Sequence, residues 1–249
     1  MSELTAIYYI WRRELIRFSR SKSRIIGSLA MPFFFLAIIG TGLGSVVTVA
    51  NGSYLDFMAP GILAMVVLFG SIFSGVIVIM DRQFGFLKET MVAPVRRTSI
   101  VIGKALGGAT TAVIQGLLML GIAMLLGAHI EMVDILPAVA LMFMVSVMFV
   151  SLGIAIASTM EDMQGFQLVM NFLVMPMFFL SGALFPLTTA PDPIRWLSYI
   201  NPMTYVVEAL RYLLTGTSTM PIAVSGGILG FSLVLSVLLA TWLFNRIES

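Results

Sequence analysis

Residues 135–160 read ILPAVALMFMVSVMFVSLGIAIASTM, a stretch without a single charged side chain. As a helix rising 1.5 Å per residue, it is about 39 Å long, which exceeds the roughly 30 Å hydrocarbon core of a bilayer. Apolar and polar residues do not alternate with period two, so the pattern does not fit a strand of an outer-membrane barrel. The stretch therefore predicts a transmembrane helix.

Further uncharged stretches of at least 24 residues occupy 25–55, 57–80, 105–128, 163–191 and 212–245. The composition agrees, with 59% apolar residues, 10% charged residues and a mean hydropathy of +1.04. A water-soluble domain carries roughly a quarter charged residues, so that class is excluded. We expect an all-α membrane protein, with residues 1–249 forming one domain of six transmembrane helices.

The basic residues predict the orientation of these helices. Twelve of the fourteen Lys and Arg residues lie before Ile25, within 82–104, or at Arg246, and only Arg195 and Arg211 lie elsewhere. Because Lys and Arg are enriched in cytoplasmic segments, both termini and the loop are expected in the cytoplasm.

Residues 1–24 predict an amphipathic helix in the membrane interface. Apolar side chains recur at steps of three and four residues, at Leu4, Ile7, Tyr8, Trp11, Leu15 and Phe18. The opposite side carries Arg13, Arg17, Arg20 and Arg24. Such a helix lies in the headgroup plane with its arginines toward phosphates and cytosol. A plain helical extension of the first span is the alternative.

The stretch 185–216, between the fifth and sixth spans, is too long for a tight turn and too apolar for a free loop. Four prolines interrupt it, and residues 194–200 and 203–214 read as short helices. Since broken backbone at membrane depth must be buried in protein, we expect two re-entrant helices at the outer side. An ordinary external loop with two surface helices is the alternative.

The sequence shows no ion-coupling residues in its spans and no catalytic or nucleotide-binding motif. The six predicted spans contain no Asp, Glu, Lys, Arg or His, whereas ion-coupled carriers place such groups inside the membrane. The single histidine, His129, is a weak metal candidate beside Glu131 and Asp134, and there is no cysteine. A P-loop needs glycine where Thr98 precedes Gly103-Lys104, and no G-x-S-x-G or H-E-x-x-H motif occurs. We expect no catalytic, cofactor or metal site, so energy for uphill transport must come from another subunit.

Small and soft side chains characterise the predicted spans. The G-x-x-x-G pairs Gly40/Gly44, Gly103/Gly107 and Gly226/Gly230 predict close packing between helices. Nineteen Met and eighteen Phe residues supply adaptable apolar surface.

Two segments contain the most distinctive motifs of the chain. The loop 81–97 reads DRQFGFLKETMVAPVRR, in which Phe84, Leu87 and Met91 share a helical face and Pro94 ends the helix. The later segment reads LSGALFP over 180–186, followed by NPMTY over 201–205 and EALR over 208–211.

Together these segments resemble the ABC-2 family of ATP-binding-cassette transporter permeases. In that family R-x-x-G-x-L-x-x-x-x-x-x-P-x-x-R recurs between spans two and three, and S-G-x-x-F-P then N-P-x-x-Y-x-x-E-x-x-R recurs late in the chain. The loop is most similar to the daunorubicin-resistance branch of multidrug exporters, from which Gln83 and Arg96 depart.

The resemblance implies a homodimer in the cell membrane of a prokaryote, with two P-loop ATPase subunits that hold ATP and magnesium below it. The coupling loop, 81–98, would contact the ATPase through Phe84, Gly85, Leu87, Lys88, Glu89, Pro94 and Arg97. The outer re-entrant signature would comprise Ser181, Gly182, Phe185, Pro186, Asn201, Pro202, Tyr205, Glu208 and Arg211. The interface helix would contribute Trp11, Arg13, Arg17 and Arg20. Glu208 and Arg211 lie three residues apart on one helix and are expected to pair.

The sequence thus predicts the permease subunit of an ABC exporter for an amphiphilic or hydrophobic, drug-like or lipid-like substrate. Neutral spans favour such a cargo because an ion would need polar ligands along its path. Export of lipid-linked polysaccharide is the alternative within the family. An ion-coupled carrier, which would transport without an ATPase, and an intramembrane enzyme, which would form product alone, are the alternatives outside it.

Overall fold

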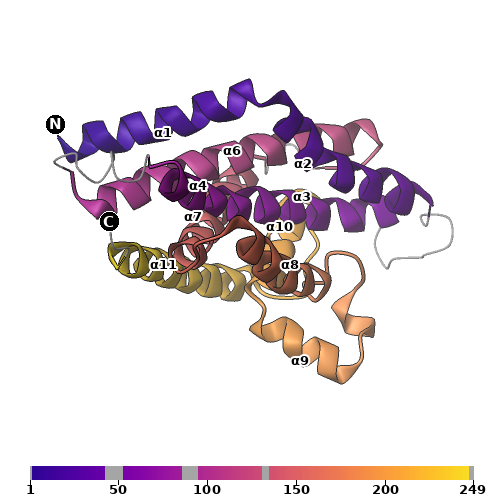
Figure 1. Ribbon diagram of the computed structural model, residues 1–249. Coiled ribbons are helices and arrows are strands. Elements are labelled where there is room, and N and C mark those ends of the chain that lie inside the picture. Colours follow the sequence, from indigo (N-terminus) through magenta and orange to yellow (C-terminus); the bar gives the residue numbers. More distant parts are fainter. Residues whose placement is uncertain (1, 43–52, 86–94, 131–134, 247–249) are drawn as a thin grey trace.

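The computed structural model describes residues 2–42, 53–85, 95–130 and 135–246 (Figure 1). Within these ranges every regular element is helical, which confirms the all-α prediction. In chain order the elements are α1 (Glu3–Arg20), α2 (Lys22–Phe34), η1 (Phe35–Gly40), α3 (Tyr54–Ile72), η3 (Phe73–Gly75), α4 (Val76–Gln83), α6 (Arg97–Leu125), α7 (Ile135–Ser158), α8 (Met163–Phe179), η5 (Leu187–Thr189), α9 (Asp192–Ile200), α10 (Pro202–Thr215) and α11 (Ile222–Asn245).

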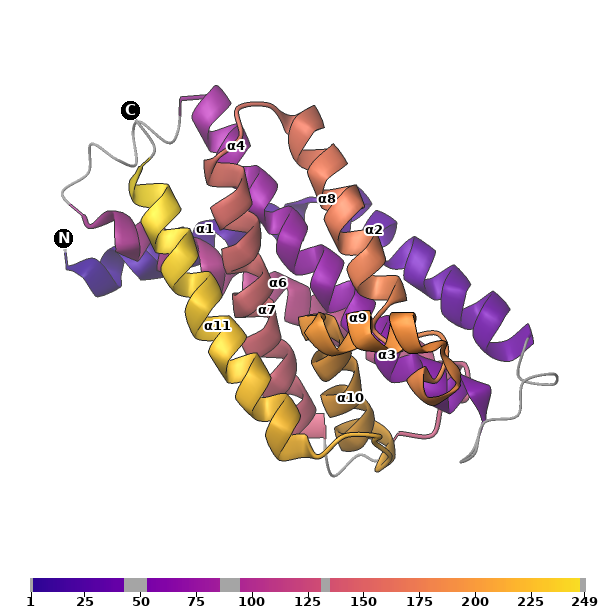
Figure 2. The same ribbon diagram turned by 90° about the horizontal axis from the view of Figure 1, so that it is seen from below.

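Helix α3 forms the centre of the bundle. Every residue from Met58 to Leu68 is buried, as expected for a helix that is apolar on all sides. Helices α6, α7 and α10 pack around it. Figure 2 shows α11 on the outside of α7, and Figure 1 shows α9 below the long helices.

Four helical stretches within the described ranges are long and apolar enough to cross a membrane: Tyr54–Gln83, Arg97–Leu125, Ile135–Ser158 and Ile222–Asn245. A fifth crossing is present if α1 and the segment Ile25–Gly40, bent by 68°, form one broken span. Helix α8 is shorter than the predicted span 163–191, because the chain turns after Phe179 and its 17 residues cover only about 26 Å. By length and composition, the described residues thus provide four or five candidate spans, and the count of six stays a prediction.

The stretch Tyr54–Gln83 tightens into a short 3-10 turn where it crosses α7. The short η3 turn ends at Gly75, which lies against the backbone of Gly153, and a Cβ atom on Gly153 would lie 2.5 Å from the carbonyl oxygen of Ile72. The two backbones therefore touch, and glycine on both sides permits this close crossing.

Helix α1 lies alongside the first half of α6 (Figure 1). Its contact uses one of the G-x-x-x-G pairs: a Cβ on Gly103 would lie 2.9 Å from Ile10, and a Cβ on Gly107 would lie 2.7 Å from Glu14. The indole of Trp11 adds a hydrogen bond from Nε1 to Oγ1 of Thr110, 3.1 Å long. This glycine pair therefore receives the amino-terminal helix.

The other two glycine pairs behave differently. A Cβ on Gly226 or Gly230 of α11 would meet nothing within 4 Å. The same helix exposes large apolar side chains, among them Phe231 and Leu238. Gly40 packs on Leu55, while Gly44 lies outside the described residues. The prediction of close packing is therefore wrong for Gly226 and Gly230 within a single copy of the chain.

Candidate functional site

Five charged side chains form an ionic cluster where α1, α4 and α6 meet: Arg13, Glu14, Arg17, Asp81 and Lys104. Asp81 is its centre, with carboxylate oxygens 2.5 Å from Nζ of Lys104, 3.0 Å from Nη2 of Arg13 and 3.4 Å from Nη2 of Arg17. Arg17 also lies 3.8 Å from Glu14. Asp81 and Lys104 are only 2% and 6% exposed, so this pair is little screened by water and salt. The cluster therefore joins three helices that are far apart in the sequence.

The ionic cluster lies directly next to two of the predicted uncharged spans, 57–80 and 105–128. The sequence places Asp81 and Lys104 in a cytoplasmic loop. In the structure α4 extends to Gln83 and α6 begins at Arg97, so both charges lie inside candidate membrane-spanning helices. The buried charges of opposite sign neutralise each other once the helices pack, which evaluating each charge alone does not predict.

Of the residues assigned to the interface helix, some contact other parts of the protein and others are exposed. Trp11, Arg13 and Arg17 contact α6 or Asp81, so two of the arginines turn into the protein rather than away from it. Arg20 is exposed in the last turn of α1. The predicted apolar stripe faces outward at its start, where Leu4 is 78% exposed.

Three of the predicted coupling residues lie in the described part of the chain, and Leu87, Lys88, Glu89 and Pro94 lie outside it. Gly85 ends α4 with φ +78°, a left-handed conformation that favours glycine. Phe84 is 68% exposed. Arg97 donates from Nη1 to the carbonyl oxygen of Asn245 at 2.9 Å, which joins the start of α6 to the end of α11.

The amino-terminal helix, the two described ends of the coupling loop and the α7–α8 turn meet at one end of the bundle. Nε2 of Gln83 donates to the carbonyl oxygen of Glu161 at 3.1 Å, and Arg82 lies 3.7 Å from the carboxylate of that residue. Glu3 accepts a hydrogen bond from Oγ of Ser99 at 2.6 Å. The two ends of the loop are thus held to α1, to α11 and to the α7–α8 turn.

The Ser-Gly segment, residues 180–186, lies between α8 and η5, at the end of the bundle opposite the ionic cluster. Gly182 adopts φ +75°, and a Cβ there would lie 2.8 Å from the side chain of Leu187, so glycine is required on both grounds. The hydroxyl of Ser181 donates to a carbonyl in the last turn of α8 at 2.6 Å. Ala183 lies against Gly61 of α3, where a Cβ would approach its oxygen to 2.6 Å. The segment is therefore fixed on the central helix.

The two short helices form close to the predicted positions. Asn201 caps α10, because Oδ1 accepts from a backbone N–H of its first turn at 3.0 Å, and Nδ2 donates to the carbonyl oxygen of Met177 at 2.6 Å. Pro202 occupies the first helical position, where a missing N–H costs nothing. The hydroxyl of Tyr205 donates to the carbonyl oxygen of Tyr199 at 2.7 Å, which ties α10 to α9.

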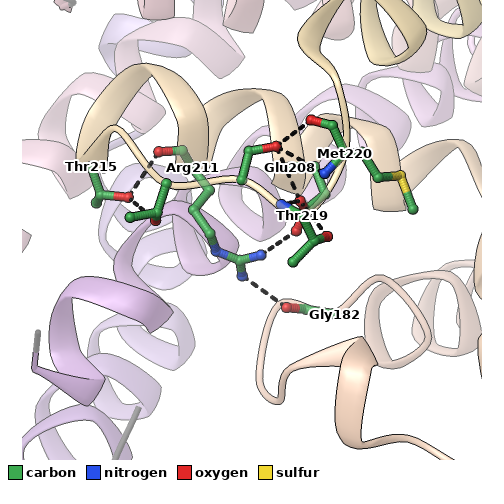
Figure 3. Close-up of polar contacts among 8 residues, drawn as sticks. Gly182, Glu208, Arg211, Thr215, Thr219 and Met220 are labelled. Atoms are coloured by element: carbon green, nitrogen blue, oxygen red, sulfur yellow. Dashed lines mark hydrogen bonds and ion pairs between the residues drawn. The ribbon is translucent and has the colours of Figure 1, made fainter. Parts of the chain in front are cut away.

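Glu208 and Arg211 form the predicted pair, and both are buried (Figure 3). Nη1 of Arg211 lies 2.5 Å from Oε1 of Glu208, and Nη2 donates to the carbonyl oxygen of Gly182 at 2.9 Å. The guanidinium also lies 4.2 Å from the centre of the Phe57 ring. The other oxygen of Glu208 accepts from the backbone N–H and the hydroxyl of Thr219, at 2.6 and 2.8 Å. The pair thus links α10 to α3, to the Ser-Gly segment and to the connection between α10 and α11.

A cavity of about 620 Å³ lies beside this pair. Arg211, Glu208 and Phe57 line it, together with Pro186 of the outer signature. Phe185, the neighbouring signature residue, is 38% exposed. The signature residues therefore build the wall and the support of one cavity.

His129 lies at the edge of the same cavity. Its Nδ1 is 3.5 Å from Oδ2 of Asp56, and its backbone N–H donates to Oδ1 of Asp56 at 2.7 Å. Glu131 and Asp134 lie outside the described residues. Among the residues that are described, no group of three or more His, Asp or Glu side chains could hold a metal ion.

A family model and several known proteins match most of this chain. A family model described as "ABC-2 type transporter" matches residues 5–215. Nodulation protein J of Rhizobium meliloti (strain 1021) is 26% identical over 241 residues, which are 95% of this chain and 92% of the relative. The inner membrane transport permease YadH of Escherichia coli (strain K12) is 27% identical over 248 residues, 97% of this chain and 95% of the relative.

Proposed function

Because this chain belongs to the ABC-2 type transporter family, a family of multi-pass membrane permeases that work with ATPase partners, we propose that it is the permease subunit of an ABC exporter. Its cargo is an amphiphilic or hydrophobic, drug-like or lipid-like molecule, and two separate P-loop ATPase subunits supply the energy from ATP and magnesium. Export of lipid-linked polysaccharide is the second candidate in the family.

The ionic cluster is the observation that carries the proposal. Asp81 lies four residues before Gly85, at the start of the predicted coupling loop, and Lys104 lies in α6 after the loop. Asp81 also binds Arg13 and Arg17 of α1. A push on the loop therefore reaches α1, α4 and α6 together, because the buried contacts resist separation. This is what a permease without its own ATPase requires.

A second cavity supports the choice of cargo. It measures about 370 Å³ and lies between α2, α3 and α6. Its walls are mainly soft and aromatic, with Met31, Met65, Phe69 and Phe73, and the amide of Gln115 is a buried polar group beside them. Apolar walls with one polar group suit an amphiphile and offer little to a bare ion.

The proposed assembly is a homodimer with six spans per chain, cytoplasmic termini and re-entrant α9 and α10. The segment Ile25–Gly40 and the short helix α8 would complete the count of six. Helix α1 would lie in the inner membrane interface, which agrees with its exposed Leu4 and Tyr8. The open glycine face of α11 is available to lipid or to the second copy.

The test uses the full chain, co-purified with candidate ATPase subunits and placed in lipid vesicles. Asp81→Asn leaves three cations facing a neutral amide, and we expect the complex to assemble while substrate-stimulated ATP hydrolysis and transport fall at least about tenfold. Asp81→Glu keeps the charge and should retain a large part of the stimulation. Asp192→Asn, which removes an exposed ion pair with Arg195, is the matched control and should change neither rate.

Two loop variants test the docking itself. Gly85→Trp and Glu89→Arg should weaken assembly with the ATPase subunits. Normal transport by Asp81→Asn, together with normal assembly by both loop variants, would overturn the coupling assignment. Accumulation of a solute by the chain alone, driven by a proton or sodium gradient, would overturn the proposal as a whole.

A further inference from the structure

The cavity beside Glu208 and Arg211 has an unusual lining. Alongside an apolar wall formed by Phe57, Ile130 and Leu187, it carries hydroxyl groups from several segments. These hydroxyl side chains are Thr188, Thr215, Thr217, Ser218 and Thr219. Its volume of about 620 Å³ is in the range of small-molecule sites.

The charged groups of this cavity all bind partners within the protein. Glu208 binds Arg211 through one oxygen and Thr219 through the other. Asp56 accepts from the backbone N–H groups of His129 and Ser53 and completes the capping box of α3. A cationic ligand would meet Arg211, and an anionic ligand would meet two carboxylates. A strongly charged ligand of either sign is therefore disfavoured.

Among the described residues that line this cavity, Arg211 has a buried donor without a partner. Nε of Arg211 makes no hydrogen bond within the described part of the chain, although Nη1 and Nη2 of the same guanidinium are both bound. Arg211 is only 5% exposed, and an unsatisfied buried donor is costly. Arg211 also lines the cavity, and a neutral hydroxyl or ether oxygen would satisfy this donor without adding charge.

We propose that this cavity binds the uncharged, hydroxyl-rich headgroup of an amphiphile, of which a glycosyl group is the simplest form. The hydroxyl lining exchanges hydrogen bonds with the headgroup, and the apolar wall takes the C–H surface of the sugar ring. Its role in transport, as the last station before release, rests on the proposed function. The binding itself does not, because it needs no ATPase.

The absence of native cysteine permits a clean measurement. In Thr188→Cys, the full chain in nanodiscs carries its only thiol on the cavity wall, and maleimide labelling reports access to it. The probes are octyl glucoside, octyltrimethylammonium and octyl sulfate, each below its micelle concentration, so that only the headgroup differs. Thr189→Cys, on the neighbouring residue that does not line the cavity, is the matched control.

We expect octyl glucoside to slow labelling of Thr188→Cys roughly fivefold, the value for about 80% occupancy, and to leave Thr189→Cys unchanged. The two charged probes should change either rate less than about twofold. Adding Thr217→Val, which removes one lining hydroxyl at nearly constant volume, should reduce the protection by glucoside. Thr241→Val, in α11 and away from the cavity, should not reduce it.

Equal protection by all three probes would mean that only the alkyl tail binds, and this would overturn the proposal. The proposal would also be overturned if octyl glucoside gave no protection, or if it protected the Thr217→Val variant fully. Protection without any ATP-driven transport would leave the site standing and refute the proposed function instead.

Discussion

Replacing Arg211 by Met would remove the cation that joins α10 to the Ser-Gly segment. Breaking a buried pair by removing one partner costs about 3–5 kcal/mol, because the other charge stays buried. Glu208 keeps its bonds to Thr219, which favours the lower end of this range. The lost hydrogen bond to the carbonyl oxygen of Gly182 adds about 1 kcal/mol. We therefore expect the free energy of unfolding to fall by about 4 kcal/mol.

The assay is thermal unfolding of the purified chain in a mild detergent, followed by circular dichroism at one fixed heating rate. For a chain of this size 1 kcal/mol corresponds to about 2–4 °C, so the apparent Tm of Arg211→Met should fall by roughly 10 °C. The fixed rate matters because large membrane proteins often unfold irreversibly. Limited proteolysis should show earlier cleavage in the segment 180–191, which the guanidinium holds in place.

The double variant Glu208→Gln/Arg211→Met separates charge from packing. It removes the buried carboxylate that the single variant leaves unpaired, so it should recover at least half of the lost Tm. If the double variant is no more stable than Arg211→Met, the destabilisation comes from lost contacts alone, and the electrostatic reasoning is refuted.

Three further substitutions test the packing described above. Gly107→Leu forces a side chain into α1 and should lower the free energy of unfolding by about 1–3 kcal/mol, seen as faster tryptic cleavage within α1. Gly226→Leu meets no neighbour and should leave the cleavage rate unchanged, so equal effects of the two variants would contradict the docking of α1. Gly153→Ala brings a methyl group onto a backbone oxygen of α3 and should lower the apparent Tm by several degrees, and an unchanged Tm would argue against the close crossing. Tyr205→Phe loses one hydrogen bond between α10 and α9 and should cost about 1 kcal/mol, measured in the same unfolding assay, and a larger loss would require a further contact of this hydroxyl.

Much of the architecture follows from local pattern. The helices α7 and α11 lie within the uncharged stretches 135–160 and 212–245, since long apolar runs have few other ways to satisfy their backbone in a membrane. Asn201-Pro202 marks the start of α10 because its chemistry is local to one helix end. The pairing of Glu208 with Arg211 could be predicted for the same reason, because the two residues are three positions apart and lie within one helical turn.

Other features could not be read locally. The lengths of α4 and α6, and with them the burial of Asp81 and Lys104, depend on a contact across 23 residues of chain. The one signal was the pair Gly103/Gly107, which indicated a close neighbour without saying that the neighbour is α1. Glu14, a carboxylate that is buried against α6, gave no sequence signal because its partner Arg17 also fits a solvated helix face.

The sequence by itself determined that this chain is a helical membrane protein of the permease type, because hydrophobic run length and motif order are properties of consecutive residues. The tertiary structure alone decided which charges are buried together, which glycines touch another backbone and where a hydroxyl-lined cavity opens. The physical reason is that burial, neutralisation and close approach are relations between segments distant in the chain, and they exist only once the helices have packed.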